Sequence, residues 1–376
     1  MFILHLFSNW KWTGPAEHAL NLCRMLKLRG HRVVFACGMP PEGGHDSVRK
    51  RAAGSDVETL DLRLRKHLNL IDNLRDVRAI SRYIRAEGPD IIHTHMTNDN
   101  LLAGVSAGIA RSSVPVVRTS YEGKGLEKTW RNRLLMSYMT STLLVVSESA
   151  VQADVDNFHL SRDNVRKIDI GVDTDRFSPA ATGPDVRKTL GIGPEDVVVG
   201  VVARIQWHRR FDVFLEALRL ACGKMPNLKA VIVGRGTNMV PVAVEPARKM
   251  GLNGKVVFTG YKESDEYVDT LSSMDIKVFL VPGTDGSCRA VREAMAVGLP
   301  VIAADRGMLP EIVEHGRNGF VIDDTPENLA GAILKLASDS TLRRRMGEAS
   351  RQIALERFSL DKEAREVEEV YKTLLG

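Results

Sequence analysis

Short, fully apolar runs alternate with longer amphipathic stretches along most of this chain. A strand that is apolar at every position is buried on both faces, which is typical of a parallel sheet covered by helices on both sides. The alternation therefore predicts an α/β fold. The predicted strands are Phe2–Phe7, His31–Cys37, Asp90–His93, Val114–Thr119, Leu143–Val146, Val197–Ala203, Leu228–Val233, Lys255–Thr259, Ile276–Val281 and Pro300–Ala303.

The alternation pauses once, between Gly171 and Pro194, and then restarts. The intervening residues are rich in Gly, Pro, Asp and Thr, a composition typical of a linker. A chain of 376 residues also favours two domains, because most domains hold ~100–200 residues. We therefore expect two tandem Rossmann-like, doubly wound parallel-sheet domains facing each other across a cleft, with ligand bound at the carboxyl ends of the strands.

The apolar runs, the cysteines and the net charge indicate where the protein resides and what kind of ligand it binds. No apolar run approaches the ~20 residues of a membrane-spanning helix, and the start, MFILHLFSNW, predicts a strand because it lacks the flanks of a signal peptide. The four cysteines share no metal-like spacing, so we expect a reduced, cytoplasmic protein. The net charge of +5 suits an anionic ligand, an anionic membrane surface or an ordinary solvated surface. We expect no nucleic-acid partner.

The stretch Gly283–Ala296, GTDGSCRAVREAMA, combines a glycine-containing loop with the start of a predicted helix. Asp285 opens the loop, and seven residues separate it from Glu293 in the helix, which Gly298 and Pro300 end. Backbone N–H groups at a helix N-terminus are unpaired and the helix dipole is positive there, so a phosphate binds favourably. The two carboxylates can accept hydrogen bonds from sugar hydroxyls. A nucleotide-sugar meets both requirements.

Cations follow the strand VVVGVVAR. Arg204 ends this strand, and Arg209 and Arg210 come shortly after it. The carboxyl end of a strand faces the ligand crevice of an open α/β sheet, so we interpret Arg204 and Arg209 as groups that neutralise a leaving diphosphate. We interpret Arg210 as part of a basic surface cluster.

The loop SNWKWTGPAE joins the first predicted strand to the first predicted helix. Gly14 permits a close approach of the backbone to a ligand, Pro15 suits the first helical position, and Glu17 lies where the helix dipole favours an acid. Trp10 and Trp12 have two open interpretations: they stack on a sugar ring or touch lipid, or they cover the local core.

Other polar residues give weaker evidence of a functional site. His93 and His95 form a pair without a third metal ligand at a plausible spacing, so we expect no metal site; His93 is interpreted as buried and His95 as a candidate ligand contact. Asp173 and Asp175 lie in the linker and are interpreted as turn residues. The sequence Val233–Gly236, VGRG, lacks the third glycine of a dinucleotide fingerprint, which disfavours a dehydrogenase.

Taken together, these residues resemble the family-4 retaining glycosyltransferases of GT-B architecture. Besides the motifs above, the resemblance rests on RGHRV at 29–33, PDIIHTH at 89–95, GVDTDRFSP at 171–179, LKAVIVGRG at 228–236, FTGY at 258–261 and GLPVIAADRGMLPEIVEHGRNGFVI at 298–322. It implies an acceptor-binding domain over 1–175, a nucleotide-sugar-binding domain over 176–357, and a helix over 358–376 that crosses back to the first domain.

The resemblance also implies roles for individual residues. Arg204 and Arg209 would bind the diphosphate, Asp285 the donor sugar and Glu293 the nucleotide ribose, with no metal or other cofactor needed. The implied catalytic residues are thus Arg204, Arg209 and Asp285. The remaining implied contacts to the donor are Gly14, Tyr121, Gly234, Lys262, Gly286, Ser287, Cys288, Arg289 and Ala290, and those to the acceptor are Trp10, Trp12 and His95.

The chain departs from the family pattern around the donor sugar. Asp285 stands where the family has Glu, Ser287 and Cys288 replace Phe and Gly, Arg209 replaces Lys, and Tyr121 occupies the position of a donor-contacting histidine. These departures reshape the donor-sugar pocket, so the resemblance does not identify the sugar.

The implied reaction is transfer of a sugar from a nucleotide diphosphate to a hydroxyl with retention of configuration. Two basic segments with interleaved apolar residues, Leu62–Leu70 and Trp130–Tyr138, are predicted as helices. They suggest a lipid-linked or envelope-glycan acceptor and peripheral contact with the inner membrane face, unless they are ordinary helices that pack inward. A non-catalytic nucleotide-sugar-binding protein, a same-fold epimerase and a phosphorylase remain as alternatives.

Overall fold

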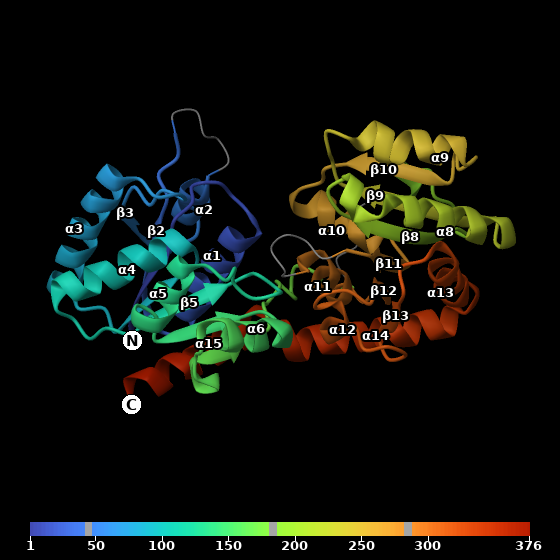
Figure 1. Ribbon diagram of the computed structural model, residues 1–376. Helices are drawn as coiled ribbons and strands as arrows, with labels where there is room; N and C mark the ends of the chain where they lie inside the picture. Colours follow the sequence, from blue (N-terminus) through green and yellow to red (C-terminus); the bar gives the residue numbers. More distant parts are fainter. Residues whose placement is uncertain (42–46, 180–185, 282–287) are drawn as a thin grey trace. The chain divides into compact units, whose positions relative to one another are not determined.

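The computed structural model describes residues 1–41, 47–179, 186–281 and 288–376. The chain forms two compact units (Figure 1). The described part of the first unit comprises Met1–Gly171 and Leu360–Gly376, and the second unit comprises the described residues between Val172 and Ser359. No helix in the described ranges has the length and apolarity needed to cross a bilayer.

The first unit is built on a parallel sheet of seven strands in the order β3-β2-β1-β4-β5-β6-β7. The strand order reverses direction between β1 and β4, which creates a switch point where ligands bind in open α/β sheets. The strands are β1 (Phe2–Phe7), β2 (Arg32–Cys37), β3 (Glu58–Asp61), β4 (Ile91–Thr94), β5 (Val116–Ser120), β6 (Thr142–Val145) and β7 (Val165–Lys167).

Helices cover both faces of this sheet. Along β1, Leu4 and Leu6 enter one core cluster with α3 and α4, whereas Ile3 and Phe7 enter another with α1 and α15, as the two-residue period of a strand requires. The helices are α1 (Gly14–Leu28), α2 (Val48–Ala53), α3 (Leu70–Glu87), α4 (Thr97–Ala110), α5 (Trp130–Tyr138), α6 (Glu148–Phe158), the 3-10 turn η1 (Arg162–Asn164) and α15 (Leu360–Leu375).

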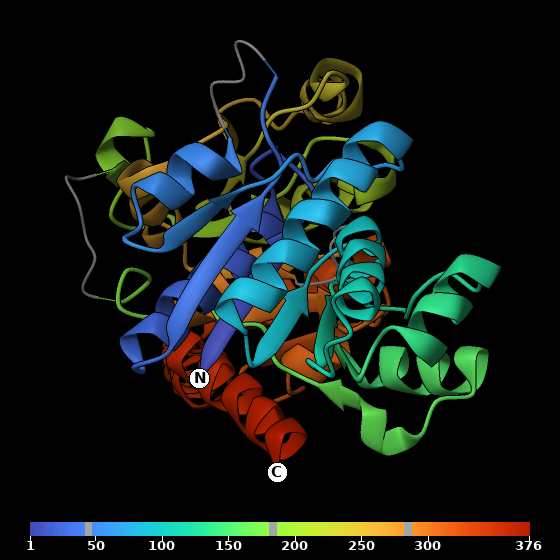
Figure 2. The same ribbon diagram turned by 90° about the vertical axis from the view of Figure 1, so that its left-hand side faces the viewer.

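The last helix, α15, belongs to the first unit. It lies against α1, where Arg29 donates from Nε to Glu368 at 2.6 Å, and Glu363 accepts a hydrogen bond from the backbone N–H of Gly171 at 2.8 Å. The hydroxyl of Tyr371 is hydrogen bonded to His93 in β4. Figure 2 shows both chain ends in this part of the molecule.

The second unit repeats the topology with a parallel sheet of six strands in the order β10-β9-β8-β11-β12-β13. Its switch point lies between β8 and β11. The strands are β8 (Val197–Val202), β9 (Leu228–Val233), β10 (Val256–Gly260), β11 (Ile276–Phe279), β12 (Val301–Ala304) and β13 (Gly319–Ile322).

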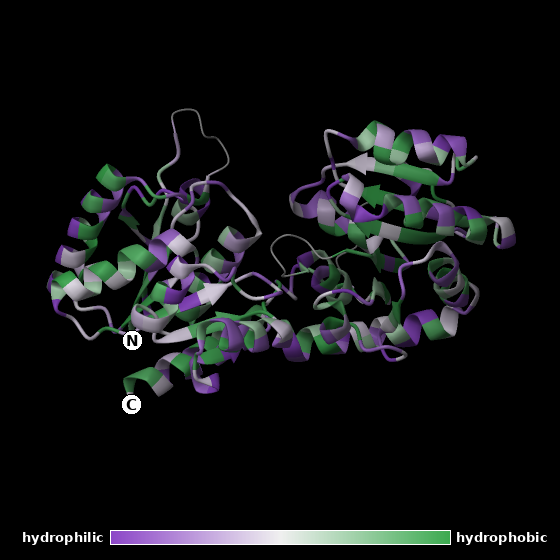
Figure 3. Cartoon of the chain, viewed as in Figure 1, coloured by the Kyte–Doolittle hydropathy of each residue, from purple (hydrophilic) through white to green (hydrophobic). Residues whose placement is uncertain are grey.

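One core cluster of the second unit takes alternate residues of its central strands. Val199 and Val201 of β8 and Ile276 and Val278 of β11 pack in it with α8 and α13, and hydrophobic colour accordingly concentrates on the strands (Figure 3). The helices are α7 (Val186–Thr189), η2 (Trp207–Arg209), α8 (Phe211–Lys224), η3 (Val240–Val244), α9 (Glu245–Lys249), α10 (Ser264–Ser272), α11 (Arg289–Ala296), α12 (Leu309–Ile312), α13 (Pro326–Ser338) and α14 (Ser340–Arg357).

The predicted fold class is confirmed, and each predicted strand is present with ends shifted by at most a few residues. The apolar pattern of the sequence did not predict β3, β7 and β13, which are short or lie at sheet edges, and β3 is mostly exposed. The expectation of a helix over Leu62–Leu70 is wrong: α3 begins only at Leu70. The reason is local, because the buried Asp76 carboxylate accepts from the backbone N–H groups of Arg63 and Leu64 at 2.9 and 2.8 Å and fixes an irregular segment.

Candidate functional site

Arg204 lies just beyond the carboxyl end of β8, at the switch point of the second sheet. The backbone on either side of it is fixed by two hydrogen bonds. Ala203 N donates to the carbonyl of Val233, the last residue of β9, at 3.1 Å, and Ile205 N donates to the carbonyl of Arg235, in the loop after β9, at 3.2 Å. The Arg204 side chain is exposed. The structure therefore holds the backbone of this residue firmly while its guanidinium stays accessible to an anion.

The predicted donor contact Gly234 has a structural reason to be glycine. A Cβ at this position would lie 2.0 Å from the carbonyl oxygen of Ala203, and the Gly234 φ of +148° is one that other residues rarely adopt. A Cβ on Gly236 would likewise lie 2.0 Å from the carbonyl oxygen of Ile205. These glycines let the loop after β9 press against the loop that carries Arg204.

Arg209 ends the short helix η2 and reaches across to the neighbouring strand. Its Nη1 donates to the carbonyl of Val281 at 3.1 Å, two residues beyond the end of β11. Arg209 also lines a pocket at the carboxyl ends of β8 and β11 with Val201, Ala203, Phe211, Phe214, Val278, Phe279, Leu280 and Val281. Arg210, by contrast, forms an ion pair with Asp324.

Helix α11 begins at Arg289 and is preceded by Cys288, a buried residue in the left-handed conformation with φ of +46°. The first N–H groups of any α-helix have no acceptor within the helix, and those of Arg289 and Ala290 belong to this first turn. The predicted contacts Cys288, Arg289 and Ala290 therefore form a helix start. Asp285, Gly286 and Ser287 lie outside the described residues.

Glu293 is buried on α11, and both of its carboxylate oxygens have partners. The hydroxyl of Tyr267 in α10 donates to Oε2 at 2.6 Å, and Nε of Arg289 lies 2.8 Å from Oε1. Hydrogen bonds to a charged group are stronger than neutral ones, so these two contacts hold the carboxylate in place. A ribose hydroxyl would have to share Oε1 with Arg289, whose side chain is about one-third exposed.

Lys277 is a buried cation that is not among the residues predicted from the sequence. It lies in β11 on the sheet face opposite the core cluster of Ile276 and Val278. Burial lowers the pKa of Lys277 to about 7, although the negative charge of Glu293 raises it in part. Within the described ranges, Nζ of Lys277 has no hydrogen-bond partner. A lysine inside the apolar strand IKVF was the signal that would have found it.

Lys262 follows β10, and its Nζ lies 3.2 Å from Oε2 of Glu266 one turn along α10. This contact is largely exposed on the glutamate side. Lys262 is thus on the same edge of the second sheet as Arg204, because both follow the carboxyl end of a strand.

The first loop of the chain leads into α1. Gly14 is the first residue of this helix, with Pro15 in its first turn and the acid Glu17 behind it. Trp12 packs against the core cluster on the α1 side of the sheet, with the guanidinium of Arg51 4.9 Å from its ring centroid. Trp10 is half-buried, with Nζ of Lys11 5.4 Å from its ring centroid.

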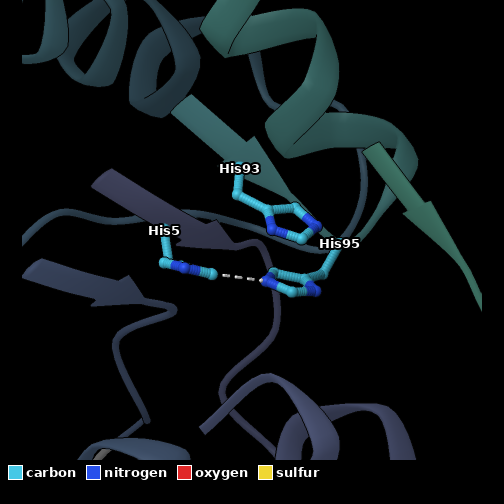
Figure 4. A group of neighbouring side chains, drawn as sticks. All are labelled: His5, His93 and His95. Carbon is cyan, nitrogen blue, oxygen red and sulfur yellow. Dashed lines mark hydrogen bonds between the residues drawn. The ribbon is translucent and has the colours of Figure 1, made fainter. Parts of the chain in front are cut away.

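At the switch point of the first sheet lie three buried histidines: His5 from β1, His93 from β4, and His95 just after β4 (Figure 4). Nδ1 of His5 and Nε2 of His95 are hydrogen bonded at 3.0 Å, and the His93 ring stacks on that of His95 at a centroid distance of 4.5 Å. Burial lowers the pKa of His5 to about 3 and the pKa values of His93 and His95 well below 6.5. The cluster is therefore neutral at pH 7.

The geometry of this histidine cluster suits hydrogen bonding better than metal binding. Two nitrogens held at about 2.0–2.1 Å from one tetrahedral ion lie roughly 3.4 Å apart, whereas the facing nitrogens of His5 and His95 are 3.0 Å apart. Both ring nitrogens of His93 are also occupied, by Tyr371 and by Thr119 Oγ1 at 2.7 Å. The cluster would have to rearrange to hold an ion.

Tyr121, which follows β5, extends the cluster. Its hydroxyl is hydrogen bonded to Nδ1 of His95 at 2.9 Å, and its ring stacks on His18 at a centroid distance of 5.9 Å. Tyr121 and His95 are both buried. The structure therefore brings two predicted ligand contacts together, as parts of one hydrogen-bonded chain that runs from Tyr121 through His95 to His5.

Two family models match the chain and together span most of it. The model for "Glycosyltransferase Family 4" matches residues 12–176, and the model for "Glycosyl transferases group 1" matches residues 184–353. The residues around Arg204, Arg209 and Glu293 all fall in the second match.

Two curated bacterial relatives match over most of their length. The lipopolysaccharide core biosynthesis mannosyltransferase LpsB of Rhizobium meliloti is 25% identical over 336 residues, covering 87% of this chain and 91% of the relative. The UDP-Gal:alpha-D-GlcNAc-diphosphoundecaprenol alpha-1,3-galactosyltransferase of Escherichia coli is 23% identical over 320 residues, covering 81% of each.

Two solved structures share the fold over nearly the whole chain. A glycosyltransferase from Rickettsia africae superposes with a TM-score of 0.85 at 20% identity, covering 100% of this chain and 98% of that one. The Anabaena protein Alr3699/HepE in complex with UDP superposes with a TM-score of 0.81 at 19% identity, covering 99% and 100%. At this identity the two structures establish the shared GT-B architecture.

Proposed function

Since this chain belongs to the family-4, group 1 glycosyltransferases, we propose that it transfers a sugar from a nucleotide-diphosphate sugar to a hydroxyl acceptor with retention of anomeric configuration. The observation that carries this proposal is the carboxyl edge of the second sheet. Arg204 follows β8, Arg209 reaches the end of β11, and the chain continues from there to α11 with its buried Glu293. Guanidinium groups, a helix start and a fixed carboxylate match diphosphate and ribose chemistry.

The donor belongs to the class of nucleoside diphosphate sugars. The Anabaena neighbour was solved with UDP and with UDP-glucose, and the Escherichia coli relative is named for UDP-Gal, so UDP-sugars are the first donors to test. Asp285, Ser287 and Cys288 differ from the family pattern around the donor sugar. The sugar is therefore left to experiment.

In the proposed reaction the bond between the anomeric carbon and the β-phosphate oxygen breaks, and a bond from that carbon to the acceptor oxygen forms. Negative charge builds on the departing diphosphate, where Arg204 and Arg209 stabilise it, while positive charge builds on the sugar ring. Asp285 orients the sugar, and Glu293 holds the ribose. The acceptor proton passes to the departing diphosphate, so the scheme assigns no separate base. No metal takes part, because the two arginines and the α11 dipole supply the positive charge.

We infer an acceptor from envelope glycan or lipid-linked saccharide synthesis. The Rhizobium relative is named for lipopolysaccharide core biosynthesis, and the Escherichia coli relative's name includes a diphosphoundecaprenol-linked sugar. The first unit is proposed to bind this acceptor at its own switch point, near His95, with Trp10 and Trp12 on the loop before α1.

A thermal-shift screen of nucleotide-sugars, followed by turnover assays, tests the function. We expect a small set of nucleotide-sugars, sharing one base, to raise the melting temperature, and the best of them to yield a glycosylated product with an acceptor mixture from bacterial envelopes. NMR of the product should show the donor's anomeric configuration.

The other outcomes separate the rivals. Tight donor binding without any product indicates a non-catalytic binding protein, and rearrangement of the donor sugar without an acceptor indicates an epimerase. If none of the nucleotide-sugars shifts the melting temperature, the proposed donor site is wrong.

A further inference from the structure

Four large apolar side chains are exposed around the start of α3. Leu70 and Ile71 are 71% and 66% exposed, and Leu68 and Leu74 are more than half exposed. The opposite face of the same helix is already buried in the core through Val77, Ile80 and Ile84. These four side chains therefore take little part in the packing of the unit. Their burial against another surface would remove a large apolar area from water.

A second apolar stripe lies on α5. Trp130, Leu134 and Tyr138 are spaced by four residues and so share one helix face. Trp130 is 81% and Tyr138 82% exposed. Leu135 and Met136 supply the buried contacts of this helix, so the α5 stripe is also outside the core. The expectation that this segment only packs inward is not met for these three side chains.

The two stripes border one polar network. Asn98, at the start of α4, donates from Nδ2 to the carbonyl of Arg65 at 2.8 Å, and its Oδ1 accepts from Asn73 of α3 at 3.2 Å and from Arg131 of α5 at 3.4 Å. The starts of α3, α4 and α5 therefore converge on Asn98, with α4 in contact with both neighbours (Figure 1). We call the seven exposed side chains the α3–α5 surface: Leu68, Leu70, Ile71, Leu74, Trp130, Leu134 and Tyr138.

Charge around the α3–α5 surface is strongly positive on the α3 side. Residues 62–82 contain six Lys and Arg and only two acids, and both acids are buried. Asp72 is paired with Arg65 at 2.9 Å, and Asp76 accepts backbone hydrogen bonds. Near the apolar stripes in the sequence, Lys66, Arg75 and Arg133 are exposed cations, and Glu127, just before α5, is an exposed acid.

We propose that the α3–α5 surface docks on an anionic phospholipid bilayer. Exposed Leu and Ile insert into the acyl boundary, Trp and Tyr favour the headgroup level, and Lys and Arg attract anionic lipid. This inference rests on the proposed function in one respect: the surface lies at the carboxyl edge of the sheet proposed to bind a lipid-linked acceptor, since α3, α4 and α5 each begin after a strand ends there.

Flotation of the full chain with vesicles tests the proposal. We expect the protein to float with phosphatidylcholine vesicles that contain phosphatidylglycerol at low salt, to float far less with phosphatidylcholine alone, and to be released by high salt. Replacing Ile71 and Trp130 by Ser should reduce the partition coefficient by at least about tenfold. The matched control is Leu28→Ser, which removes an exposed leucine at the end of α1 and should change little.

A charge-reversal variant and its control separate electrostatic attraction to anionic lipid from insertion of apolar side chains. Lys66→Glu with Arg133→Glu should weaken binding to phosphatidylglycerol vesicles by about tenfold or more, whereas Arg24→Glu, an exposed cation on α1, should not. Absence of flotation at low salt overturns the proposal, as does equal binding by Leu28→Ser and the Ile71 and Trp130 variant. If sedimentation shows instead that these side chains mediate self-association, the surface is a contact between copies and the membrane proposal is wrong. The thermal shift by a nucleotide-sugar is independent of all these results, so failure of docking and failure of the proposed function are distinguishable.

Discussion

The two sheets share a strand order and differ in the chemistry at their switch points. In the second unit the carboxyl edge carries Arg204, Arg209 and the start of α11, beside the paired carboxylate of Glu293. In the first unit the same position is filled by neutral imidazoles that bind one another and Tyr121. One topology thus offers an edge suited to an anion and an edge suited to neutral hydroxyl groups. On the basis of this difference we propose that the diphosphate binds to the second unit and the acceptor to the first.

Removal of the Arg204 guanidinium tests most directly whether the second unit binds the diphosphate. Arg204→Ala should lower kcat on the order of a hundredfold, because one positioned contact to the developing charge on the diphosphate is lost. Initial rates of nucleotide release with a saturating acceptor measure the effect. Arg219→Ala on α8, which loses only an exposed pair with Glu216, is the control; equal rates for the two variants would remove Arg204 from the mechanism.

Gly234, which packs against the backbone before Arg204, should contribute to the stability of the second unit. Gly234→Ala places a Cβ against the carbonyl of Ala203 and should lower the free energy of unfolding by about 2 kcal/mol. Chemical denaturation measures it. Gly223→Ala on α8 is the matched control, because no atom lies within 4 Å of its new Cβ and alanine favours a helix. A wild-type value for Gly234→Ala would mean that the two loops are not pressed together.

The neutral histidine cluster predicts a pH effect confined to the first unit. Burial lowers the pKa of His5 from 6.5 to about 3 in the folded chain, so below pH 6.5 the unfolded chain binds a proton that the folded chain does not. His5→Leu should therefore gain stability relative to wild type, by about 1.4 kcal/mol for each pH unit below 6.5. Denaturation at pH 5 to 7 measures this difference. Parallel pH profiles would show that the pKa of His5 is the same in the folded and unfolded chains, which would contradict the prediction.

The smallest effect is expected at Lys262. Lys262→Ala loses a pair with Glu266 that is largely exposed, so the free energy of unfolding should change by less than about 0.5 kcal/mol. Affinity for UDP should nevertheless fall by about fivefold if Lys262 also contacts the donor, the loss expected for a contact of about 1 kcal/mol. Isothermal titration would record it; an unchanged affinity would confine Lys262 to its pair on α10.

The sequence was informative where a pattern extends over several residues. Apolar runs located the central strands of both sheets, and the resemblance selected Arg204, Arg209 and Glu293 before their positions were known. It was weak where a contact joins distant residues. Nothing adjacent to Tyr267 or Lys277 indicates that they lie near Glu293, and the pairing of His5 with His95 depends on β1 and β4 being neighbours. Exposure of the apolar side chains at the start of α3 likewise follows from which face of the helix packs inward.

The assignment of the diphosphate to the second unit is tested most directly by hydrogen exchange with and without UDP, with GDP and ADP as alternative probes if UDP does not bind. The account predicts slower exchange in peptides covering Ala203–Phe211 and Cys288–Ala296, and unchanged exchange around His5, His93 and His95. Protection at the histidine cluster and the start of α1, with none after β8 or at α11, would contradict it.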